Sequence, residues 1–243
     1  MTGPRGGITF GTMPIRAAGL AGLVVALAVT LAAAGRAGAT TPFDYITFDG
    51  IDYVRWPEDP GRALTREDLA LEFATIECSF GEDLRGCPYG MDASAAYLPA
   101  GTRIYAVRGH ATSFRLAAVS QERVYLYQAW RNARAKTGGD LWAIAGKVRA
   151  IDVQRGEPAA GAPRAARSIT APADVEALVQ MVVRAPMRRP RAQAFGDTRY
   201  WLTFWLTDGT ALERPYYPDG GELLGGVTVP PEFRGLLERY LRD

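Results

Sequence analysis

Residues 200–217 read YWLTFWLTDGTALERPYY, in which two apolar, aromatic-rich runs flank Asp208-Gly209. An Asp-Gly pair between two such runs is a strong signal for a tight β-hairpin, because both residues accept the positive φ angles of the turn. The sequence therefore predicts strands over residues 200–207 and 210–217. A two-residue turn would place Trp205 opposite Leu212, Thr203 opposite Arg214 and Trp201 opposite Tyr216.

Both faces of this predicted hairpin are apolar, whereas a sheet covered on one side should alternate between apolar and polar residues. Two arrangements are therefore open. Either flanking helices cover one face and an N-terminal sheet covers the other, or one aromatic face stays exposed. In the second case the exposed residues would form a candidate binding platform that stacks on a sugar ring or receives a protein partner. That platform would consist of Trp201, Trp205, Tyr216 and Arg214.

The segments on either side of the hairpin carry the pattern of amphipathic helices. Apolar residues recur at helical spacing before the hairpin, at Val175, Leu178, Val179 and Val182. They recur again near the C-terminus, at Phe233, Leu236, Leu237, Tyr240 and Leu241. Residues 167–243 are thus predicted to form a helix, a hairpin and a helix, which is a small α+β unit.

The chain before this unit is typical of short strands separated by turns. Residues 45–48 and 51–56 flank Asp49-Gly50, which predicts another tight hairpin. Further strands are expected in a three-strand meander and just before the loop, over residues 73–80, 103–108, 114–119, 123–130 and 147–153. Residues 40–155 are therefore predicted to form a β-rich antiparallel domain, curled into a small barrel or sandwich.

Residues 156–166 contain no large apolar side chain and are predicted to form a linker or long loop between the two parts. The complete expectation is an α+β protein. Its N-terminal part would be β-rich, and its smaller C-terminal part would be the helix-hairpin-helix unit.

The first 39 residues have the layout of a secretory signal. An uncharged run over residues 17–34 follows Arg16 and precedes the small residues Ala37-Gly38-Ala39. The run is also nearly long enough to cross a bilayer, so an uncleaved N-terminal membrane anchor is the alternative. In either case the folded part is expected outside the cytoplasm, and any membrane contact is expected only through this segment.

The two cysteines, Cys78 and Cys87, are nine positions apart, and in an oxidising compartment they are expected to form a disulfide. Closing so short a loop should stabilise the fold by about 2 to 3 kcal/mol. A redox pair would normally show Cys-x-x-Cys spacing. A metal site built on these cysteines and His110 would need a fourth ligand, so no metal is expected.

The charge balance argues against nucleic acid as a partner. The sequence carries a formal net charge of +2, and removal of Arg5, Arg16 and Arg36 with the signal would bring it to −1. Residues 44–83 are rich in acids and residues 84–155 are rich in bases, so we expect these stretches to face each other. A nucleic-acid footprint requires one strongly basic surface instead.

Catalytic motifs are missing from the sequence. His110 is its single histidine, and no serine lies in Gly-x-Ser-x-Gly or Ser-x-x-Lys. The sequence therefore lacks the motifs that indicate the catalytic triad of a serine or cysteine hydrolase. No glycine-rich phosphate loop is present, and no cofactor is expected. Paired carboxylates cannot be recognised from sequence, so a carboxylate-dependent, glycosidase-like hydrolase stays an alternative.

These observations favour an exported protein that acts as a non-catalytic binding or interaction module of the cell envelope. Its expected partner is an envelope polysaccharide or another protein. The preference for arginine over lysine, with only Lys136 and Lys147, indicates a GC-rich bacterial genome. Besides the hydrolase, the second alternative is a membrane-anchored accessory subunit.

Overall fold

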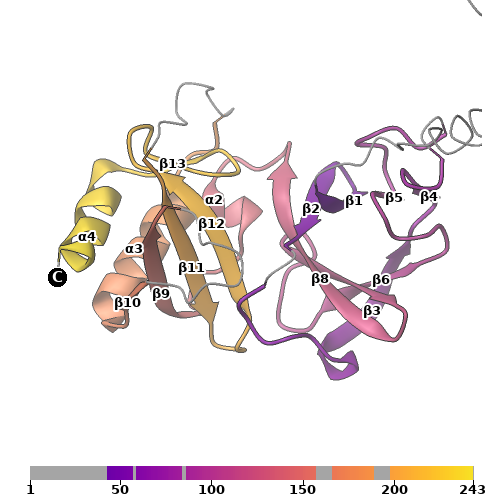
Figure 1. Ribbon diagram of the computed structural model, residues 1–243, viewed down its shortest axis with the longest axis horizontal. Coiled ribbons are helices and arrows are strands. Elements are labelled where there is room, and N and C mark those ends of the chain that lie inside the picture. The colour runs from indigo at the N-terminus through magenta and orange to yellow at the C-terminus, as the bar shows by residue number, and fades with distance from the viewer. Residues whose placement is uncertain (1–42, 57–58, 84–85, 157–165, 189–197, 243) are drawn as a thin grey trace, which may run out of the picture. The chain divides into compact units, whose positions relative to one another are not determined.

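The computed structural model describes residues 43–56, 59–83, 86–156, 166–188 and 198–242 (Figure 1). The predicted signal or anchor at residues 1–39 lies outside the described residues, as does most of the predicted linker. Residues Thr41–Asp243 form one unit, which contains two antiparallel-rich sheets.

The expected α+β class is wrong. Strands occupy 42% of the chain and helices only 17%, so the protein is mostly β. The physical reason is that the C-terminal hairpin does not stand alone between two helices. It pairs with strands on both of its sides and becomes the centre of a six-stranded sheet.

The first sheet has eight strands and is curled, with β3 and β4 at its two edges. Its strands in spatial order are β3 (Leu69–Thr75), β6 (Arg103–Val107), β7 (Arg115–Ser120), β8 (Arg123–Asn132), β2 (Ile51–Arg55), β1 (Asp44–Phe48), β5 (Ser94–Ala95) and β4 (Cys78–Ser79). All neighbours are antiparallel except β4 and β5.

The parts of this sheet that the sequence predicts correctly are strands joined by short turns. The hairpin of β1 and β2 is confirmed, and its turn residues Asp49 and Gly50 have φ of 50° and 67°. The meander of β6, β7 and β8 is also confirmed. The expected single strand over residues 73–80 is divided between β3 and β4, which lie at opposite edges of the sheet.

The second sheet has six strands among the described residues. In spatial order they are β10 (Arg167–Ile169), β9 (Val148–Arg155), β11 (Tyr200–Leu206), β12 (Ala211–Tyr217), β13 (Glu222–Leu223) and β14 (Val227–Thr228). Strand β9 precedes the predicted linker, yet it pairs along its whole length with β11. The sheet therefore combines segments from both sides of the linker.

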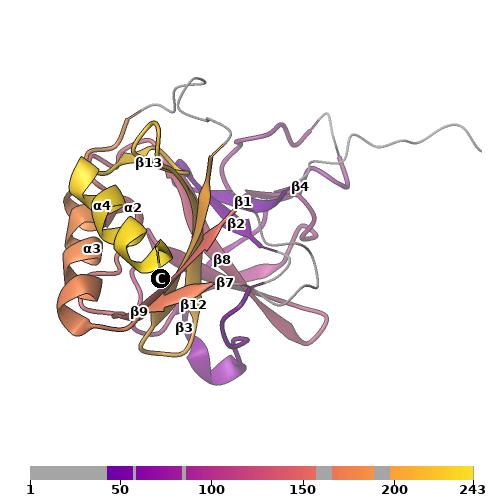
Figure 2. The same ribbon diagram turned by 60° about the vertical axis from the view of Figure 1, so that its left-hand side comes forward.

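Three helices and one 3₁₀ turn are present in the described part of the chain: α2 (Gly138–Leu141), α3 (Pro172–Arg184), α4 (Pro231–Leu241) and η1 (Arg66–Asp68). Proline occupies the first turn of α3 and of α4, where its missing N–H costs nothing. Helices α3 and α4 pack beside each other along the second sheet (Figure 2). The expected helices are thus confirmed, although they cover a larger sheet than expected.

One apolar core runs through both sheets and reaches α3 and α4. Trp142, directly after α2, is fully buried in it, and its indole Nε1 donates a hydrogen bond to the Ala129 carbonyl at 3.1 Å. This contact joins the segment around α2 to β8 of the first sheet. The two sheets therefore share packing as well as backbone.

The predicted disulfide between Cys78 and Cys87 is present, with Cα atoms 5.6 Å apart. It closes the loop that follows the edge strand β4. Within the described ranges, no helix has the length and hydropathy needed to span a bilayer.

Candidate binding surface

The central hairpin is confirmed, but its register differs from the predicted one. Trp201 lies opposite Pro215, Thr203 opposite Glu213 and Trp205 opposite Ala211. The loop has three residues instead of two: the Leu206 N–H donates to the Thr210 carbonyl at 2.9 Å. Because side chains alternate along a strand, this one-residue change turns every side chain of β12 to the other face.

The register separates the four residues of the predicted platform. Trp201 and Trp205 share one face of the sheet and remain half-buried. Arg214 and Tyr216 lie on the opposite face with Leu202, and both are buried. The Tyr216 ring packs against Phe233 of α4, with centroids 5.1 Å apart, so it belongs to the helix-covered core.

Arg214 is a core residue rather than a surface cation. Its guanidinium lies over the rings of Trp142 and Trp130, at 4.9 and 5.8 Å from their centroids. Its Nη2 donates to the Ala129 carbonyl at 2.9 Å. Burial lowers its pKa to about 9, which still leaves it charged at neutral pH. Arg214 thus fixes the second sheet to β8.

The face that carries Trp201 and Trp205 is only partly covered. Thr203 and Glu213 are buried and hydrogen-bonded to each other at 3.0 Å. Trp56 and Pro60 lie close to Glu213, so the chain after β2 crosses this side of β12. Along β9 and β11 the face is partly accessible, because Trp201, Trp205, Asp152 and Gln154 are half-buried.

We call the accessible part the tryptophan strip, defined as Trp201 and Trp205 on β11 with Asp152 and Gln154 on the neighbouring β9. The Trp205 Nε1 donates to Asp152 Oδ2 at 2.7 Å, and Ser168 Oγ on β10 donates to Asp152 Oδ1 at 2.5 Å. At about 3.4 Å per residue, the two tryptophans stand about 14 Å apart. The strip thus alternates aromatic rings with oriented polar groups.

Trp201 also contacts a second group of aromatic rings, which the sequence did not predict. We call Phe43, Trp56, Trp130 and Trp201 the aromatic cluster. Trp56 lies at its centre, with its centroid 6.2 Å from Trp201, 6.3 Å from Phe43 and 5.7 Å from Trp130. Phe43 is 48% exposed, and the tryptophans are half-buried.

The aromatic cluster is built from two strand residues and two residues that flank strands, all but Phe43 and Trp56 far apart in sequence. Trp56 follows the end of β2, Trp130 lies near the end of β8, and Phe43 precedes β1. The available signal was the placement of Trp56 and Trp130 at the last positions of two predicted strands. The indole N–H groups of Trp56 and Trp201 are buried without a partner among the described residues, and the ring of Trp56 packs edge to face on Phe43, Trp130 and Trp201.

A cavity of about 230 Å³ adjoins the aromatic cluster at Trp56. Arg55 and Arg62 line it, and the Arg55 guanidinium lies 4.6 Å from the centroid of Tyr125, another lining residue. Asp59 also lines the cavity. Planar aromatic and charged side chains therefore surround this small hollow beside the ring cluster.

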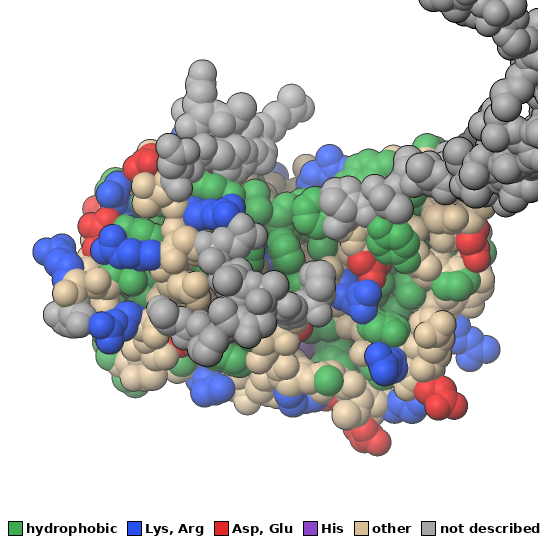
Figure 3. All heavy atoms as spheres, viewed as in Figure 1, with side chains coloured by type: hydrophobic (Ala, Val, Ile, Leu, Met, Phe, Trp, Pro, Cys, Tyr) green, Lys and Arg blue, Asp and Glu red, His purple; other side chains and the backbone are tan. Residues whose placement is uncertain are grey.

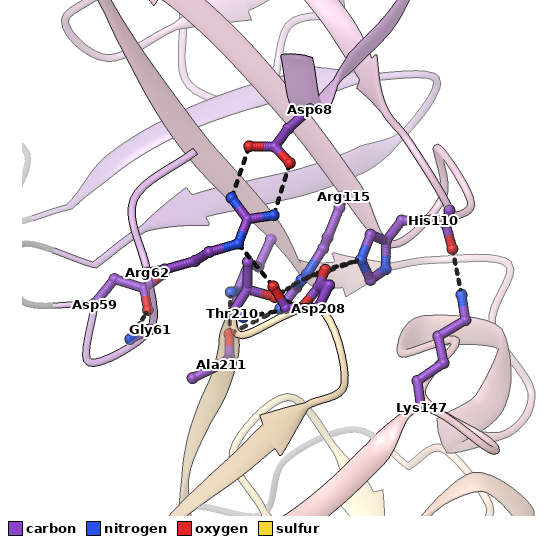
Figure 4. Close-up of polar contacts among 12 residues, drawn as sticks. Asp59, Gly61, Arg62, Asp68, His110, Arg115, Lys147, Asp208, Thr210 and Ala211 are labelled. Atoms are coloured by element: carbon purple, nitrogen blue, oxygen red, sulfur yellow. Dashed lines mark hydrogen bonds and ion pairs between the residues drawn. The ribbon is translucent and has the colours of Figure 1, made fainter. Parts of the chain in front are cut away.

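A buried polar seam joins the loop between β11 and β12 to the first sheet (Figure 4). Arg115 Nη1 donates to Thr210 Oγ1 at 2.5 Å, and its Nη2 donates to the Ala211 carbonyl at 2.8 Å. His110 Nε2 lies 2.8 Å from Asp208 Oδ2. Arg62 Nε donates to the Asp208 carbonyl at 2.7 Å, while its terminal nitrogens bind Asp68.

The electrostatics of this polar seam favour an ionised aspartate beside a neutral histidine. Burial raises the pKa of Asp208, but hydrogen bonds from Thr210 and His110 and the charge of Arg115 outweigh it and bring the pKa to about 2. Burial lowers the pKa of His110, and the hydrogen bond to Asp208 opposes this only in part.

The polar seam does not have the order of a hydrolase triad. A triad places a hydroxyl on one imidazole nitrogen and a carboxylate on the other. Here Asp208 and Arg115 both approach Nε2 of His110, and Nδ1 has no hydrogen-bond partner among the described residues. The Thr210 hydroxyl is bonded to Asp208 instead of to the histidine. These contacts hold the loop between β11 and β12 against the first sheet.

The acid-rich and base-rich stretches do face each other, as predicted. Asp52 pairs with Arg131 at 2.7 Å, and Asp49 pairs with Arg134 at 2.6 Å. On the face shown in Figure 3, basic side chains are spread among acidic and hydrophobic ones. The described residues contain no group of three or more potential ligands that could hold a metal ion.

Carboxylate catalysis requires an acid whose pKa is raised. The carboxyl pKa values that the described structure shifts are all lowered, at Asp49, Glu67, Asp68, Asp140, Asp208 and Glu238. Arginine, backbone N–H or hydroxyl partners hold each of them ionised. The geometry thus gives no observation in favour of the hydrolase alternative.

Comparison of the chain with protein-family models, with curated proteins and with solved structures gave no match.

Proposed function

We propose that this protein is an extracytoplasmic binding module that holds a saccharide chain of the cell envelope along the tryptophan strip. One observation carries the proposal: Trp201 and Trp205 lie on the same face of β11 and are both only half-buried, and the hydrogen-bonded Asp152 on β9 lies opposite Thr203, between them. Sugar rings present apolar C–H faces to aromatic rings and hydroxyl groups to carboxylates and amides. The strip offers both kinds of group at a regular spacing.

A saccharide fits this surface better than a protein partner does. Protein interfaces centre on a contiguous apolar patch that becomes dry on binding. Here Asp152, Gln154 and Ser168 interrupt the aromatic surface with polar groups, and the Asp152 carboxylate is already oriented by two hydrogen bonds. Such fixed polar groups suit a ligand rich in hydroxyls.

The proposed compartment is supported by the disulfide between Cys78 and Cys87, since such bonds persist in oxidising surroundings. The signal-like pattern of residues 1–39 supports the same location.

The proposal is tested by isothermal titration with soluble peptidoglycan fragments and with neutral wall polysaccharides. We expect one glycan class to bind, and Trp201→Ala and Trp205→Ala each to weaken that binding about thirtyfold, because a stacked tryptophan commonly contributes about 2 kcal/mol. Phe73→Ala is the matched control, since Phe73 is an exposed aromatic on β3 of the other sheet. It should leave the affinity unchanged.

Two results would contradict the proposal. One is the absence of binding to every glycan tested, and the other is binding that survives both tryptophan substitutions. If no glycan binds and a photo-crosslinker at position 205 captures an envelope protein, the partner of the strip is a protein and not a saccharide.

A further inference from the structure

A groove of about 520 Å³ lies at the C-terminal end of α3, where the chain approaches β14 and the start of α4. The tryptophan strip is on the face of the sheet that points away from α3, so the groove is a separate feature. Its volume is within the range of pockets that bind small molecules, about 300 to 1,000 Å³.

The lining of the groove is largely apolar. From α3 and the residues after it come Met181, Ala185 and Pro186, and from the other wall come Val229 and Pro230. These side chains offer a ligand only van der Waals and hydrophobic contact. The apolar part of a ligand can therefore be buried here, away from water.

The polar part of the lining is cationic. Arg184, at the end of α3, and Arg188 both line the groove and are exposed. Neither guanidinium has an ion pair or hydrogen bond with another described residue, and none of the described residues that line the groove is acidic. Gln180 and Thr228 are the other polar residues in the described lining. Within the described part of the chain, two positive charges without an acidic partner thus stand beside an apolar hollow.

Backbone hydrogen bonds hold the two walls of the groove in place. The Thr228 N–H donates to the Pro186 carbonyl at 3.0 Å, and the Arg188 N–H donates to the Gly226 carbonyl at 2.8 Å. The chain after α3 is thereby fixed to β14. Because the walls are already connected, a ligand would not have to order them on binding.

We propose that this groove binds a small amphiphile that has a single carboxylate head and an apolar body. The carboxylate pairs with Arg184 and Arg188, whose planar guanidinium groups match its geometry. The apolar body lies against Met181, Val229 and Pro230. Complementarity of charge selects the anion, and the volume of the groove limits the body to a medium-length chain or a few rings.

The experiment uses decanoate as the probe, with decan-1-ol and decylammonium as neutral and cationic partners of equal chain length. Binding is followed by calorimetry and by the ¹³C-methyl signals of methionine, with Met181 in the groove and Met91, in the loop between β4 and β5, as reference. We expect decanoate to shift Met181 but not Met91. We also expect decanoate to bind at least tenfold more tightly than decan-1-ol, and decylammonium not to bind.

Arg184→Gln and Arg188→Gln should each weaken decanoate binding about tenfold, whereas Arg123→Gln, at an exposed arginine that begins β8, should not. Gln180→Trp keeps a helix-compatible residue on α3 and should fill the groove and abolish binding. The proposal is overturned if the alcohol binds as well as the acid, if the arginine variants bind normally, or if decanoate shifts Met91 equally. Failure of glycan binding at the tryptophan strip has no bearing on these outcomes.

Discussion

At the scale of single residues, the pair of His110 and Asp208 gives the protein a defined response to pH. The structure lowers both pKa values, and it leaves the imidazole neutral against an ionised carboxylate. In the unfolded chain His110 recovers a pKa of about 6.5 and binds a proton more readily than in the fold. Stability is therefore complete above that value and is lost as the pH falls through the window below it.

We predict that the free energy of unfolding of the wild-type protein decreases between pH 7.5 and pH 5.5, and that His110→Gln reduces this slope. The attribution is direct because the sequence has no other histidine. Urea titrations at both pH values measure the effect. An unchanged slope in the variant would show that His110 titrates equally in the folded and unfolded states.

The low pKa of Asp208 also predicts that the free energy of unfolding decreases further in acid. Asp208 has a pKa of about 2 in the fold and about 3.9 when unfolded, so its contribution is present above about pH 4 and is lost as the pH approaches 2. Asp208→Asn would remove this component but also the carboxylate that orients Thr210 and His110.

At the scale of elements, the three-residue loop of the central hairpin decides which side chains face the helices. Gly209 has φ of +84° there, a left-handed conformation that fits a hairpin loop of this length. Asp208 accepts hydrogen bonds from both the N–H and the hydroxyl of Thr210, which fixes the loop from within. The loop therefore sets the register of β12.

We predict that Gly209→Ala destabilises the protein by about 1 to 2 kcal/mol, because alanine is strained at positive φ. A Cβ at this position would also meet the Arg62 side chain at 3.3 Å. Gly235→Ala is the matched control: it is inside α4 with nothing within 4 Å of the new Cβ, and it should stabilise by about 0.5 to 1 kcal/mol. Thermal and urea unfolding measure the sign of the stability change in each variant. Two changes of the same sign would contradict this explanation.

At the scale of the whole described unit, the two sheets are joined by buried polar groups as well as by apolar packing. Arg115 of β7 and Gln128 of β8 both donate to the Ala211 carbonyl of β12, at 2.8 and 2.7 Å. In the other direction, Arg214 of β12 donates to β8. Burial lowers the pKa of Arg115 to about 10, so it stays cationic at neutral pH. Directional bonds of this kind permit one arrangement of the sheets.

We predict that Arg115→Met lowers the free energy of unfolding by about 3 kcal/mol, because it leaves Thr210 and Asp208 without their buried cation. Arg123→Met, at an exposed position that begins β8, should change it by less than about 0.5 kcal/mol. Chemical denaturation followed by tryptophan fluorescence compares the two. Equal stability of the variants would mean that apolar packing alone joins the sheets.

The sequence predicted those features that neighbouring residues determine. The Asp49-Gly50 hairpin, the amphipathic pattern of α3 and the pairing of Cys78 with Cys87 each follow from local chemistry or short loops. The candidate surface was predicted only by half. Trp201 and Trp205 were found because both are on one strand. Trp56, which contacts Trp201, and Trp130, which contacts Trp56, come from the chain of the first sheet and were missed.

By itself, the sequence determined most of the longer strands, the two hairpins that contain Asp-Gly and the helices α3 and α4, since hydrophobic period and turn residues act over a few positions. Only the tertiary structure decided that the hairpin lies at the centre of a six-stranded sheet and that the protein is mostly β. It also decided that Arg214 and Tyr216 are core residues. The physical reason is that strand pairing and register depend on hydrogen bonds between distant segments, such as those from Arg62 and Arg115 to the loop after β11, which no local pattern records.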